Sequence, residues 1–415
     1  MKITRALLLI FFALVLLASP RARAQDETPR QWYETPGRNN VVPAEDLPDH
    51  IGDDNRLWHV ELHGRQFFNI ITIEGDRAYC GMSALNLPER IKSRNGALLC
   101  INVHTGETIW QTEFPQGGGY GLSVVPLLDG DRIYQQFGSN AYCLNKETGE
   151  ILWRKSLQVN DYFMNRMHGT HTTGLLIGDY WYMATGHATG SDCPEWPWHS
   201  MEAPFHPNIV VMEKETGKIV AQDAVPIREH QHGQWCSLST GVVDGKRLVF
   251  WGDGFGEVHA FQAPEKFEGT EVATLKEVWR CDANPHSYRY EEDGTHLPYA
   301  AWMREFGPKD IGPCEVISTP VFHDGLLYVA IGRDKAYSPG RKGRHIGNGA
   351  IVCIDPKGAG DITETNKLWT NTDLGRTFCT PSIVDNRIIT ADHGGYVVTV
   401  DKDSGETLWT GDFDK

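Results

Sequence analysis

A short repeat that ends in tryptophan constrains the fold of this chain more than any other feature of its sequence. Clear copies are Cys100–Trp110, Cys143–Trp153 and Thr399–Trp409, and each carries the pattern Asn/Asp-x-x-Thr/Ser-Gly-x-x-x-Trp after a hydrophobic stretch. Gly adopts positive φ without strain, and the Asn or Asp side chain accepts hydrogen bonds from turn amides. Each copy therefore predicts a hairpin of two strands with the Trp on its outer strand.

Three further copies are weaker, and a second unit precedes every copy. Val211–Ala221 has Ala in place of Trp, Cys353–Trp369 has an enlarged turn, and Val258–Trp279 has a charged loop in place of Thr-Gly. The upstream unit, clearest in Ile317–Gly332, consists of two alternating stretches around a turn, which predicts two more strands. It recurs at Leu122–Phe137, Thr172–Gly186, Leu238–Gly252 and Cys379–Ala391, and more loosely at Phe67–Gly81. Together the two units predict a four-stranded blade.

These units predict an all-β fold, a β-propeller of four-stranded blades with six complete blades between about Phe67 and Asp412. The Trp residues expected to end outer strands and to pack on a neighbouring blade are Trp58, Trp110, Trp153, Trp279, Trp369 and Trp409. Arg56–Leu62 resembles an outer strand without inner strands of its own, which suggests a ring of seven or eight blades and a chain that lacks C-terminal blades. A β-sandwich or barrel is the competing fold, but it does not require a fixed repeat at blade-sized spacing.

Three segments are predicted along the chain: residues 1–24 as an export signal, 25–55 as an extended N-terminal segment and 56–415 as the propeller. Lys2 and Arg5 flank an apolar run that ends near an Ala-Arg-Ala cleavage pattern, which predicts a periplasmic or secreted protein. No Cys follows that pattern to carry a lipid anchor, and no later apolar stretch reaches the length of about eighteen residues that a membrane span needs. We therefore expect no stable membrane insertion.

Charge and cysteine content limit the partners and the covalent links. The formal net charge of −15 argues against nucleic acid as a partner, because phosphate binding needs clustered Lys and Arg. Cys100, Cys143 and Cys353 occupy the same position in three repeats, which predicts small buried hydrophobic residues. Export would permit disulfides, and a bridge between Cys281 and Cys314, both in predicted loops, is left open.

The Trp-ended blades resemble the pyrroloquinoline-quinone (PQQ) type repeats of quinoprotein dehydrogenases and of the outer-membrane assembly factor BamB. The runs Val329–Asp334, Ala350–Asp355 and Gly360–Thr363, together with His232–Trp235, resemble more closely a family of exported PQQ-binding-like propellers common in planctomycete-type bacteria. This resemblance covers nearly the whole of the predicted mature chain. It implies the propeller fold, and for enzyme members it implies PQQ and calcium as cofactors.

The chain lacks the marks that a resemblance to quinoprotein dehydrogenases implies. No two of its nine cysteines are adjacent, so they cannot form the vicinal disulfide of those enzymes, and no Cys-x-x-Cys-His haem segment is present. Gly-x-Ser-x-Gly, His-Glu-x-x-His, Walker and Rossmann motifs are also absent. We therefore expect a non-catalytic binding or assembly propeller of the cell envelope, with a protein, glycan or small molecule as its ligand. A PQQ- and calcium-dependent oxidoreductase is the alternative, and no cofactor is assigned.

The candidate ligand-binding residues lie in loops that the blade topology places on one face, around the central funnel. They are His168, His171, His230, His232, Trp235, Arg333, Asp334 and His393. The first four form a His-x-x-His and a His-x-His pair that suit zinc or copper, although loop histidines bonded to backbone give the same pattern. Asp253–Glu257 and Asp392–Gly395 are interpreted as turns, with calcium binding as the alternative.

Overall fold

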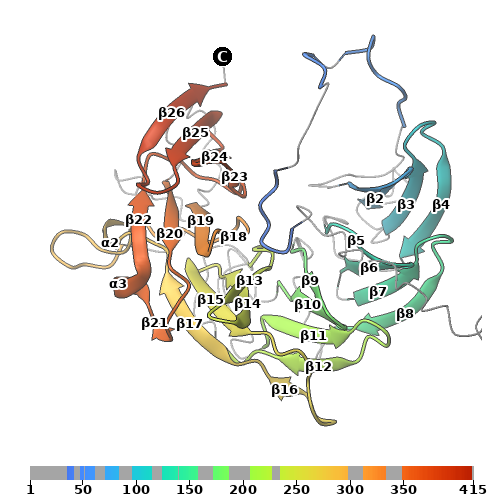
Figure 1. Ribbon diagram of the computed structural model, residues 1–415, viewed down its shortest axis with the longest axis horizontal. Coiled ribbons are helices and arrows are strands. Elements are labelled where there is room, and N and C mark those ends of the chain that lie inside the picture. The colour runs from blue at the N-terminus through green and yellow to red at the C-terminus, as the bar shows by residue number, and fades with distance from the viewer. Residues whose placement is uncertain are drawn as a thin grey trace, which may run out of the picture.

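The computed structural model describes residues 35–41, 47–50, 52–60, 71–83, 96–114, 124–138, 140–157, 172–186, 206–226, 234–297, 312–332 and 348–413. These residues contain two short helices, α2 (His286–Arg289) and α3 (Thr363–Asn366), and are otherwise strands and turns. The strands form six sheets, one for each predicted blade, which follow one another around a central axis (Figure 1). The all-β propeller prediction is confirmed, whereas a total of seven or eight blades stays a prediction.

Each blade has four antiparallel strands, and the blades are numbered 1 to 6 in chain order. Blades 1 and 2 contain β1 (Thr72–Glu74), β2 (Arg77–Ser83), β3 (Gly96–Asn102) and β4 (Thr108–Phe114), then β5 (Leu127–Asp129), β6 (Arg132–Phe137), β7 (Asn140–Asn145) and β8 (Ile151–Ser156). Blades 3 and 4 contain β9 (Leu175–Ile177), β10 (Tyr180–Ala184), β11 (Ile209–Glu213) and β12 (Ile219–Gln222), then β13 (Ser239–Val243), β14 (Lys246–Gly252), β15 (Glu257–Gln262) and β17 (Glu277–Asp282). Blades 5 and 6 contain β18 (Val321–His323), β19 (Leu326–Gly332), β20 (Gly349–Ile354) and β22 (Lys367–Asn371), then β23 (Ser382–Val384), β24 (Arg387–Ala391), β25 (Tyr396–Asp401) and β26 (Thr407–Asp412).

The turns predicted from the repeat form as the sequence indicates. In blade 2, Oδ1 of Asn145 accepts hydrogen bonds from the backbone N–H groups of the second and third residues after it, at 2.9 and 3.0 Å. Gly149 then closes the turn with a φ of 74°, a value that favours Gly. Asn102 in blade 1 and Asp401 in blade 6 make the same two bonds, so the repeat encodes the turn directly.

Five of the tryptophans predicted to end repeats dock on the blade that follows them. Nε1 of Trp110 donates a hydrogen bond to the carbonyl of Lys146, in the turn of blade 2, at 3.1 Å. The equivalent bonds run from Trp58 to Val103 (2.6 Å), from Trp153 to Lys214 (3.0 Å), from Trp279 to Pro356 (2.7 Å) and from Trp369 to Lys402 (3.2 Å). Trp58 docks on blade 1 in this way although residues 56–60 form no strand. The outer strand predicted there is therefore wrong in its described part, because no neighbouring strand pairs with that backbone.

Two enlarged turns each add an edge strand to the blade before them. Blade 3 ends in Ala221 where other blades carry Trp, and here β16 (Ala273–Thr274) pairs in parallel with β12. β21 (Gly360–Asp361) pairs with β17 in the same way, with Gly360 opposite Trp279. Backbone pairing thus joins blade 3 to the turn of blade 4, and blade 4 to the turn of blade 5, where the sequence has no Thr-Gly turn.

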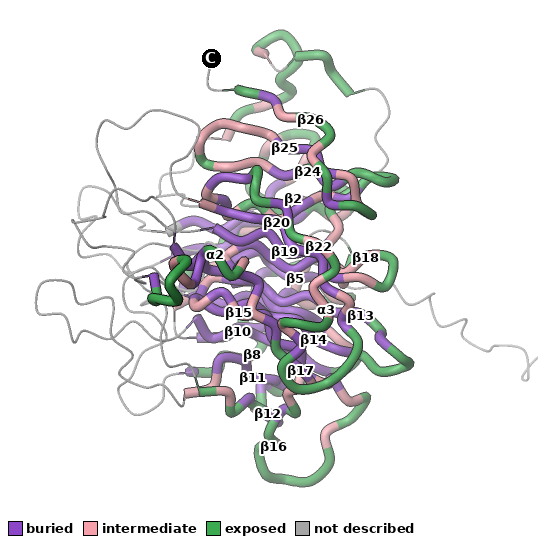
Figure 2. Tube along the Cα trace, turned by 90° about the vertical axis from the view of Figure 1, so that its left-hand side faces the viewer, coloured by how far each residue is buried: buried purple, intermediate pink, exposed green. Residues whose placement is uncertain are grey.

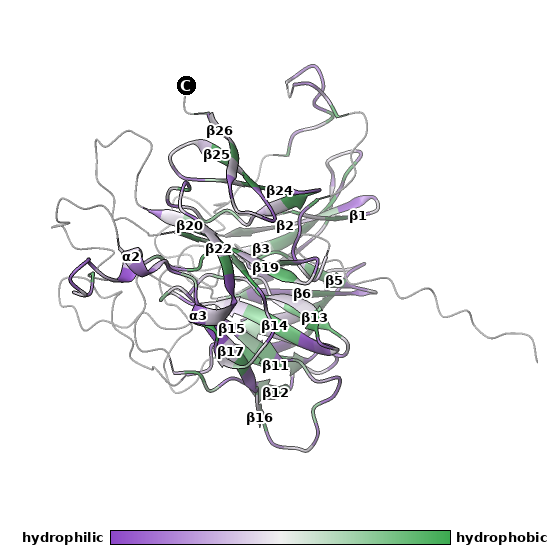
Figure 3. Ribbon diagram, turned by 60° about the vertical axis from the view of Figure 1, so that its left-hand side comes forward, coloured by the Kyte–Doolittle hydropathy of each residue, from purple (hydrophilic) through white to green (hydrophobic). Residues whose placement is uncertain are grey.

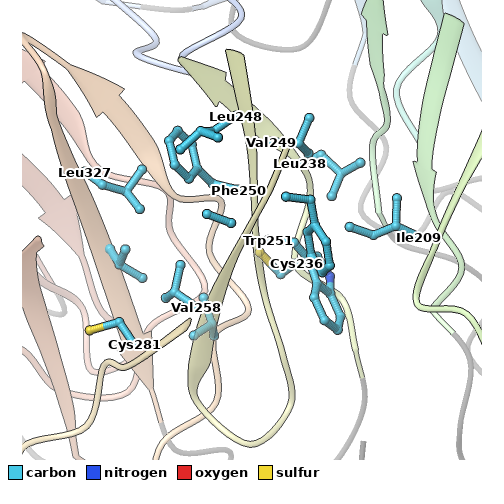
Figure 4. Close-up of a cluster of buried hydrophobic side chains, with 14 of the residues drawn as sticks. Ile209, Cys236, Leu238, Leu248, Val249, Phe250, Trp251, Val258, Cys281 and Leu327 are labelled. Atoms are coloured by element: carbon cyan, nitrogen blue, oxygen red, sulfur yellow. The ribbon is translucent and has the colours of Figure 1, made fainter. Parts of the chain in front are cut away.

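Hydrophobic side chains fill the spaces between the blades. In blades 1 to 5 the second and third strands are largely buried and hydrophobic, whereas the outer strands β4, β8 and β22 and the turns are more exposed (Figures 2 and 3). In blade 4, Phe250 points toward Leu327 of blade 5, whereas Trp251 points to the other side, toward Ile209 of blade 3 (Figure 4). This alternation is expected of a strand with a packed neighbour on each face. One buried cluster accordingly runs through blades 3, 4 and 5.

Residues 36–39, here called the axial strap, lie between the inner strands of several blades (Figure 1). The carbonyl of Pro36 accepts a hydrogen bond from the N–H of Thr240 in β13 at 2.9 Å. The side chain of Asn39 donates to the carbonyl of Ile383 in β23 at 2.9 Å and accepts from its N–H at 2.8 Å. The strap therefore links blades that are far apart in the sequence.

Among the described residues, one face of blade 6 is more exposed than the corresponding face of blade 5. The cross-strand row Tyr328, Cys353 and Trp369 of blade 5 packs against blade 6. In blade 6 the corresponding cross-strand row begins with Ile389 and ends with Trp409. These residues are 37% and 50% exposed. Among the described residues, Trp409 makes no hydrogen bond of the kind that its counterparts make.

The described cysteines form no disulfide with one another. Cys100, Cys143 and Cys353 are fully buried, as their repeat position predicts. Cys281 and Cys314 are not joined by a disulfide, so the bridge that the sequence left open does not form, and Cys281 lies in β17 rather than in a loop.

Candidate functional site

Most of the residues predicted to bind ligand fall outside the described residues. These are His168, His171, His230, His232, Arg333 and Asp334. Trp235 is half-buried shortly before β13 of blade 4. His393 is exposed in the β24–β25 turn of blade 6, with its ring 4.5 Å from that of Phe378. Trp235 and His393 therefore belong to different blades, and their part in ligand binding stays a prediction.

The axial strap places a cation on the axis, where the family resemblance implies a quinone and calcium. Arg38 is 0% exposed, and its guanidinium donates hydrogen bonds to the carbonyls of Leu238 (2.7 Å) and Gly174 (2.6 Å). Calcium needs six to eight oxygen ligands, usually with carboxylates among them, and a buried guanidinium repels a second cation. Arg38 therefore disfavours a calcium ion in its own neighbourhood.

A cavity of about 660 Å³ lies between blades 3 and 4. This blade 3–4 groove is lined by Ala224, Val225, Pro226, Asp253, Phe255, Glu257, His259, Leu275, Glu277 and Arg280. Blade 3 supplies the segment that follows β12, and blade 4 supplies the β14–β15 turn and side chains of β15 and β17. The groove therefore combines a rigid sheet face with a polar turn.

The β14–β15 turn, which was predicted as a turn, fixes two carboxylates at the groove. Oδ1 of Asp253 accepts hydrogen bonds from the backbone N–H groups of Phe255 (2.9 Å) and Glu257 (2.7 Å). These bonds hold the carboxylate, while Oδ2 lies 3.5 Å from Nε2 of His259. Burial and the nearby charge of Asp253 raise the pKa of Glu257.

His259 lies between carboxylates at the inner wall of the groove. It is 1% exposed, and its ring stacks on Trp251 with 5.4 Å between the centroids. Nδ1 is hydrogen-bonded to Oε1 of Glu277 at 2.7 Å, whereas Nε2 has no hydrogen-bond partner among the described residues. Burial opposes a charge on the imidazole, but Asp253 and Glu277 outweigh it and raise the pKa of His259 to about 10.

Two arginines near the groove pair with carboxylates outside it, although Arg280 also lines the groove and its charge acts to lower the pKa of Glu257. Arg280 lies 3.4 Å from Asp361, and Arg289 forms a 2.7 Å ion pair with Asp282. Among the described residues that line the groove, His259 is the one cationic side chain that lies between two of the groove carboxylates, those of Asp253 and Glu277. The groove is therefore a place where positive charge is favoured.

The sequence prediction missed His259 and Glu277. Glu257 and His259 are two residues apart, so on a strand their side chains share one face, and the Asp253 turn directly precedes them. The pattern Asp-x-x-x-Glu-x-His was the available signal, but it also occurs on exposed strands. What makes it a site is burial under Val225 and its neighbours in blade 3, which the local sequence does not contain.

Comparisons with known proteins agree with this architecture. Residues 49–190 match a family model described as outer membrane protein assembly factor BamB. A quinohemoprotein alcohol dehydrogenase from Pseudomonas putida HK5 is 14% identical with a TM-score of 0.52, over 82% of this chain and 58% of that one. The chain is a PQQ-like repeat β-propeller. A europium-containing methanol dehydrogenase is 11% identical to this PQQ-like propeller with a TM-score of 0.52, over 82% of this chain and 68% of that one.

At these identities the solved structures show the fold of the PQQ-like propeller and not its activity. The chain spans only 58% of the length of the Pseudomonas enzyme. The structure of BamB from Moraxella catarrhalis is 14% identical with a TM-score of 0.45, over 82% of this chain and 75% of that one. No curated protein matches the sequence. In the part of the PQQ-like propeller that the structure describes, no helix is long and apolar enough to cross a membrane.

Proposed function

We propose that this PQQ-like propeller is a non-catalytic binding protein of the cell envelope, and that its blade 3–4 groove holds a positively charged centre. The observation that carries the proposal is the convergence of Asp253, Glu257 and Glu277 on one cavity, with His259 between them. Removing a carboxylate from water costs several kcal/mol unless a cation compensates it. An ammonium group or a metal ion would supply that compensation.

Two features support binding rather than catalysis. Near the axis, where the enzyme members are implied to hold their cofactors, the axial strap here places the buried guanidinium of Arg38. The described lining of the groove contains no Ser, Thr, Cys or Lys that could serve as a nucleophile. Placement in the cell envelope rests on the predicted export signal in residues 1–24.

The test uses the full chain and two cationic probes, spermidine and Zn²⁺, with neutral N-acetylglucosamine for comparison. Calorimetry is expected to show binding of at least one cationic probe and none of the sugar. A double variant, Glu257→Gln with Glu277→Gln, removes two groove charges and is expected to weaken binding at least tenfold. The matched control, Glu265→Gln with Glu268→Gln, removes two charges from exposed positions of the same blade and should bind as the wild type does.

Three results would contradict the proposal. These are the absence of binding for both cations, an equal affinity in the two double variants, and dye-linked alcohol oxidation after addition of PQQ and calcium. The last result would favour the oxidoreductase alternative instead.

A further inference from the structure

The geometry points to a divalent metal site in the blade 3–4 groove, with Asp253, Glu257 and His259 as its protein ligands. One ligand atom from each of these residues lies within 4.8 Å of the others. This inference rests on the proposed function, because it identifies the positively charged centre of the groove as a metal ion. It differs from the zinc or copper site that the loop histidines suggested, since none of those four residues belongs to it.

The distance between Asp253 and His259 fits two ligands of one ion better than a hydrogen bond. Nε2 of His259 lies 3.5 Å from Oδ2 of Asp253, whereas a charge-assisted N–H···O bond is about 2.7–2.9 Å long. Two ligands at about 2.0–2.1 Å from a tetrahedral ion lie about 3.3–3.4 Å apart. The buried Nε2 has no hydrogen-bond partner among the described residues, so a lone pair directed at an ion would satisfy it.

Glu277 orients the imidazole as the carboxylate partners of metal-bound histidines do. Its Oε1 lies 2.7 Å from Nδ1 of His259. An ion that binds at Nε2 would displace the proton that Nε2 carries in the charged ring, while Nδ1 would keep its proton and donate it to Glu277. Histidines that bind metals usually donate their other N–H to a carboxylate or a carbonyl, which fixes the tautomer and the ring orientation. Stacking on Trp251 further restricts rotation of the ring. Glu277 is therefore a positioning residue rather than a ligand.

The equivalent turn of blade 6 shows which residues the fold itself requires. Oδ1 of Asp392 accepts hydrogen bonds from the N–H groups of Gly394 (2.7 Å) and Tyr396 (3.1 Å), just as Asp253 does in blade 4. Tyr396 occupies the place of Glu257, and Val398 that of His259. The Asp is thus needed for the turn, but the turn forms without the Glu or the His. In blade 4 those two side chains serve something other than the turn.

The ligand set favours zinc over calcium or magnesium. An imidazole nitrogen beside two carboxylates suits zinc, whereas calcium and magnesium take sets made entirely of oxygen. Three protein ligands leave at least one coordination position, and the cavity of about 660 Å³ supplies room for it. The ion would therefore be open to a water molecule or to an anionic group of a ligand that enters the groove.

The experiment measures metal content and affinity with the intact chain. The protein is first treated with EDTA and then dialysed against Zn²⁺. Elemental analysis is expected to find one tightly bound ion in the wild type and none in Glu257→Gln or in His259→Gln. Calorimetry should show that each of these variants binds at least a hundredfold more weakly than the wild type. Glu277→Gln should keep the stoichiometry but bind about 10–100-fold more weakly, because the imidazole loses its orienting partner. Control variants are Glu265→Gln, exposed in the same blade, and His104→Gln, exposed in blade 1; both should bind as the wild type does.

Circular dichroism and urea unfolding show whether a variant that no longer binds the ion is still folded. Substitution of Co²⁺ for Zn²⁺ adds a spectroscopic measurement of the site. A visible absorption band of four-coordinate Co²⁺ is expected in the wild type and is expected to vanish in folded His259→Gln. Wild-type affinity in both ligand variants would overturn the metal site. So would loss of the ion only in a variant with Ala at His168, His171, His230 and His232. Binding of spermidine without Zn²⁺ would overturn the metal site and leave the proposed function standing, whereas binding of neither cation would overturn both.

Discussion

The indole ring of Trp110 lies so close to Gly149 of the next blade that a Cβ added to Gly149 would come within 2.5 Å of ring atom Cε3. The same glycine has a φ of 74°, in the left-handed region. Gly149 is therefore required twice, once by its own backbone and once by a ring from the preceding repeat. The Gly of the turn and the Trp of the preceding repeat therefore constrain each other across the blade boundary.

Replacing Gly149 by Ala is expected to destabilise the fold by more than the left-handed backbone alone explains. Gly130 provides the matched control, because its φ is 57° and an added Cβ would meet nothing within 4 Å. Gly130→Ala should cost about 1 kcal/mol. Gly149→Ala should cost at least about 2 kcal/mol, because Trp110 must also move. Urea unfolding measures both, and an equal loss in the two variants would show that the contact with Trp110 does not matter.

Trp153→Phe is expected to weaken the joint between blades 2 and 3. The variant loses the hydrogen bond from Nε1 to the carbonyl of Lys214 and part of the ring that covers Gly217, at a cost of about 1–2 kcal/mol. Trp409→Phe is the control, because Trp409 is 50% exposed and its change should stay within about 0.5 kcal/mol. Similar destabilisation in both variants, measured by thermal and urea unfolding, would argue against the docking role of the indole N–H.

Arg38→Leu is expected to be strongly destabilising although it replaces a charge by an apolar side chain of smaller size. The carbonyls of Gly174 and Leu238 would lose a charged donor in a buried place, which costs about 1–3 kcal/mol for each group left unsatisfied. Arg247→Leu, at an exposed position of β14, is the control and should have little effect. If Arg38→Leu unfolds at the wild-type urea concentration, the strap contributes nothing to stability.

The ion pair between blades 5 and 6 predicts a small dependence of stability on pH. Nζ of Lys402 lies 2.7 Å from Oδ2 of Asp324 and holds the pKa of that carboxyl below its ordinary value. Because the folded carboxyl is the stronger acid, the pair stabilises the fold above the unfolded pKa of about 4, and this contribution is lost as the pH falls through the lower, folded pKa.

Asp324→Asn tests this dependence without changing the backbone, since Asn also tolerates the φ of 50° at this position. The exposed carboxylate limits the effect to a few tenths of a kcal/mol near pH 6, and the difference from the wild type should disappear near about pH 2. Unfolding free energies at both pH values are the measurement. A difference that persists in acid would assign the effect to something other than the charge.

Thiol labelling should distinguish Cys379 from the buried cysteines. Cys379 is exposed, whereas burial raises the pKa of Cys236 and of Cys353 to about 12, so that neither forms a thiolate near neutral pH. Cys379→Ser is expected to remove one rapidly labelled thiol at pH 8. After unfolding without a reductant, Cys281 and Cys314 should also label, and protection of that pair would indicate a disulfide.

Much of the fold follows from the sequence because the propeller repeats itself. The Asn-x-x-Thr-Gly turn and the Trp contact are both encoded within one repeat and its neighbour, so reading Asn145 to Trp153 is enough to expect them. The irregular segment around Trp58 is different, because only the absence of a pairing partner decides that it is no strand. The same holds for β16 and β21, whose partners lie in other blades.

The candidate site could be predicted only in part. The turn at Asp253 was recognised from its Gly-rich sequence, since its hydrogen bonds are local. The burial of His259 and its bond to Glu277 depend on the packing of blade 3 against blade 4 and on the register of β15 with β17. The histidine-rich loops predicted a site because their histidines are clustered along the sequence. The site at His259 is instead assembled from alternate positions on two strands.

The axial strap has a consequence for the order in which the molecule folds. Asn39 is made early in synthesis, yet its partner Ile383 follows 344 residues later. The contacts of Arg38 and Asn39 therefore cannot form until blades 3, 4 and 6 exist, and closing so long a loop is entropically costly and slow. The strap should thus be the last part of the described structure to lock into place, which makes completion of the propeller a single late event rather than the sum of blades added one at a time.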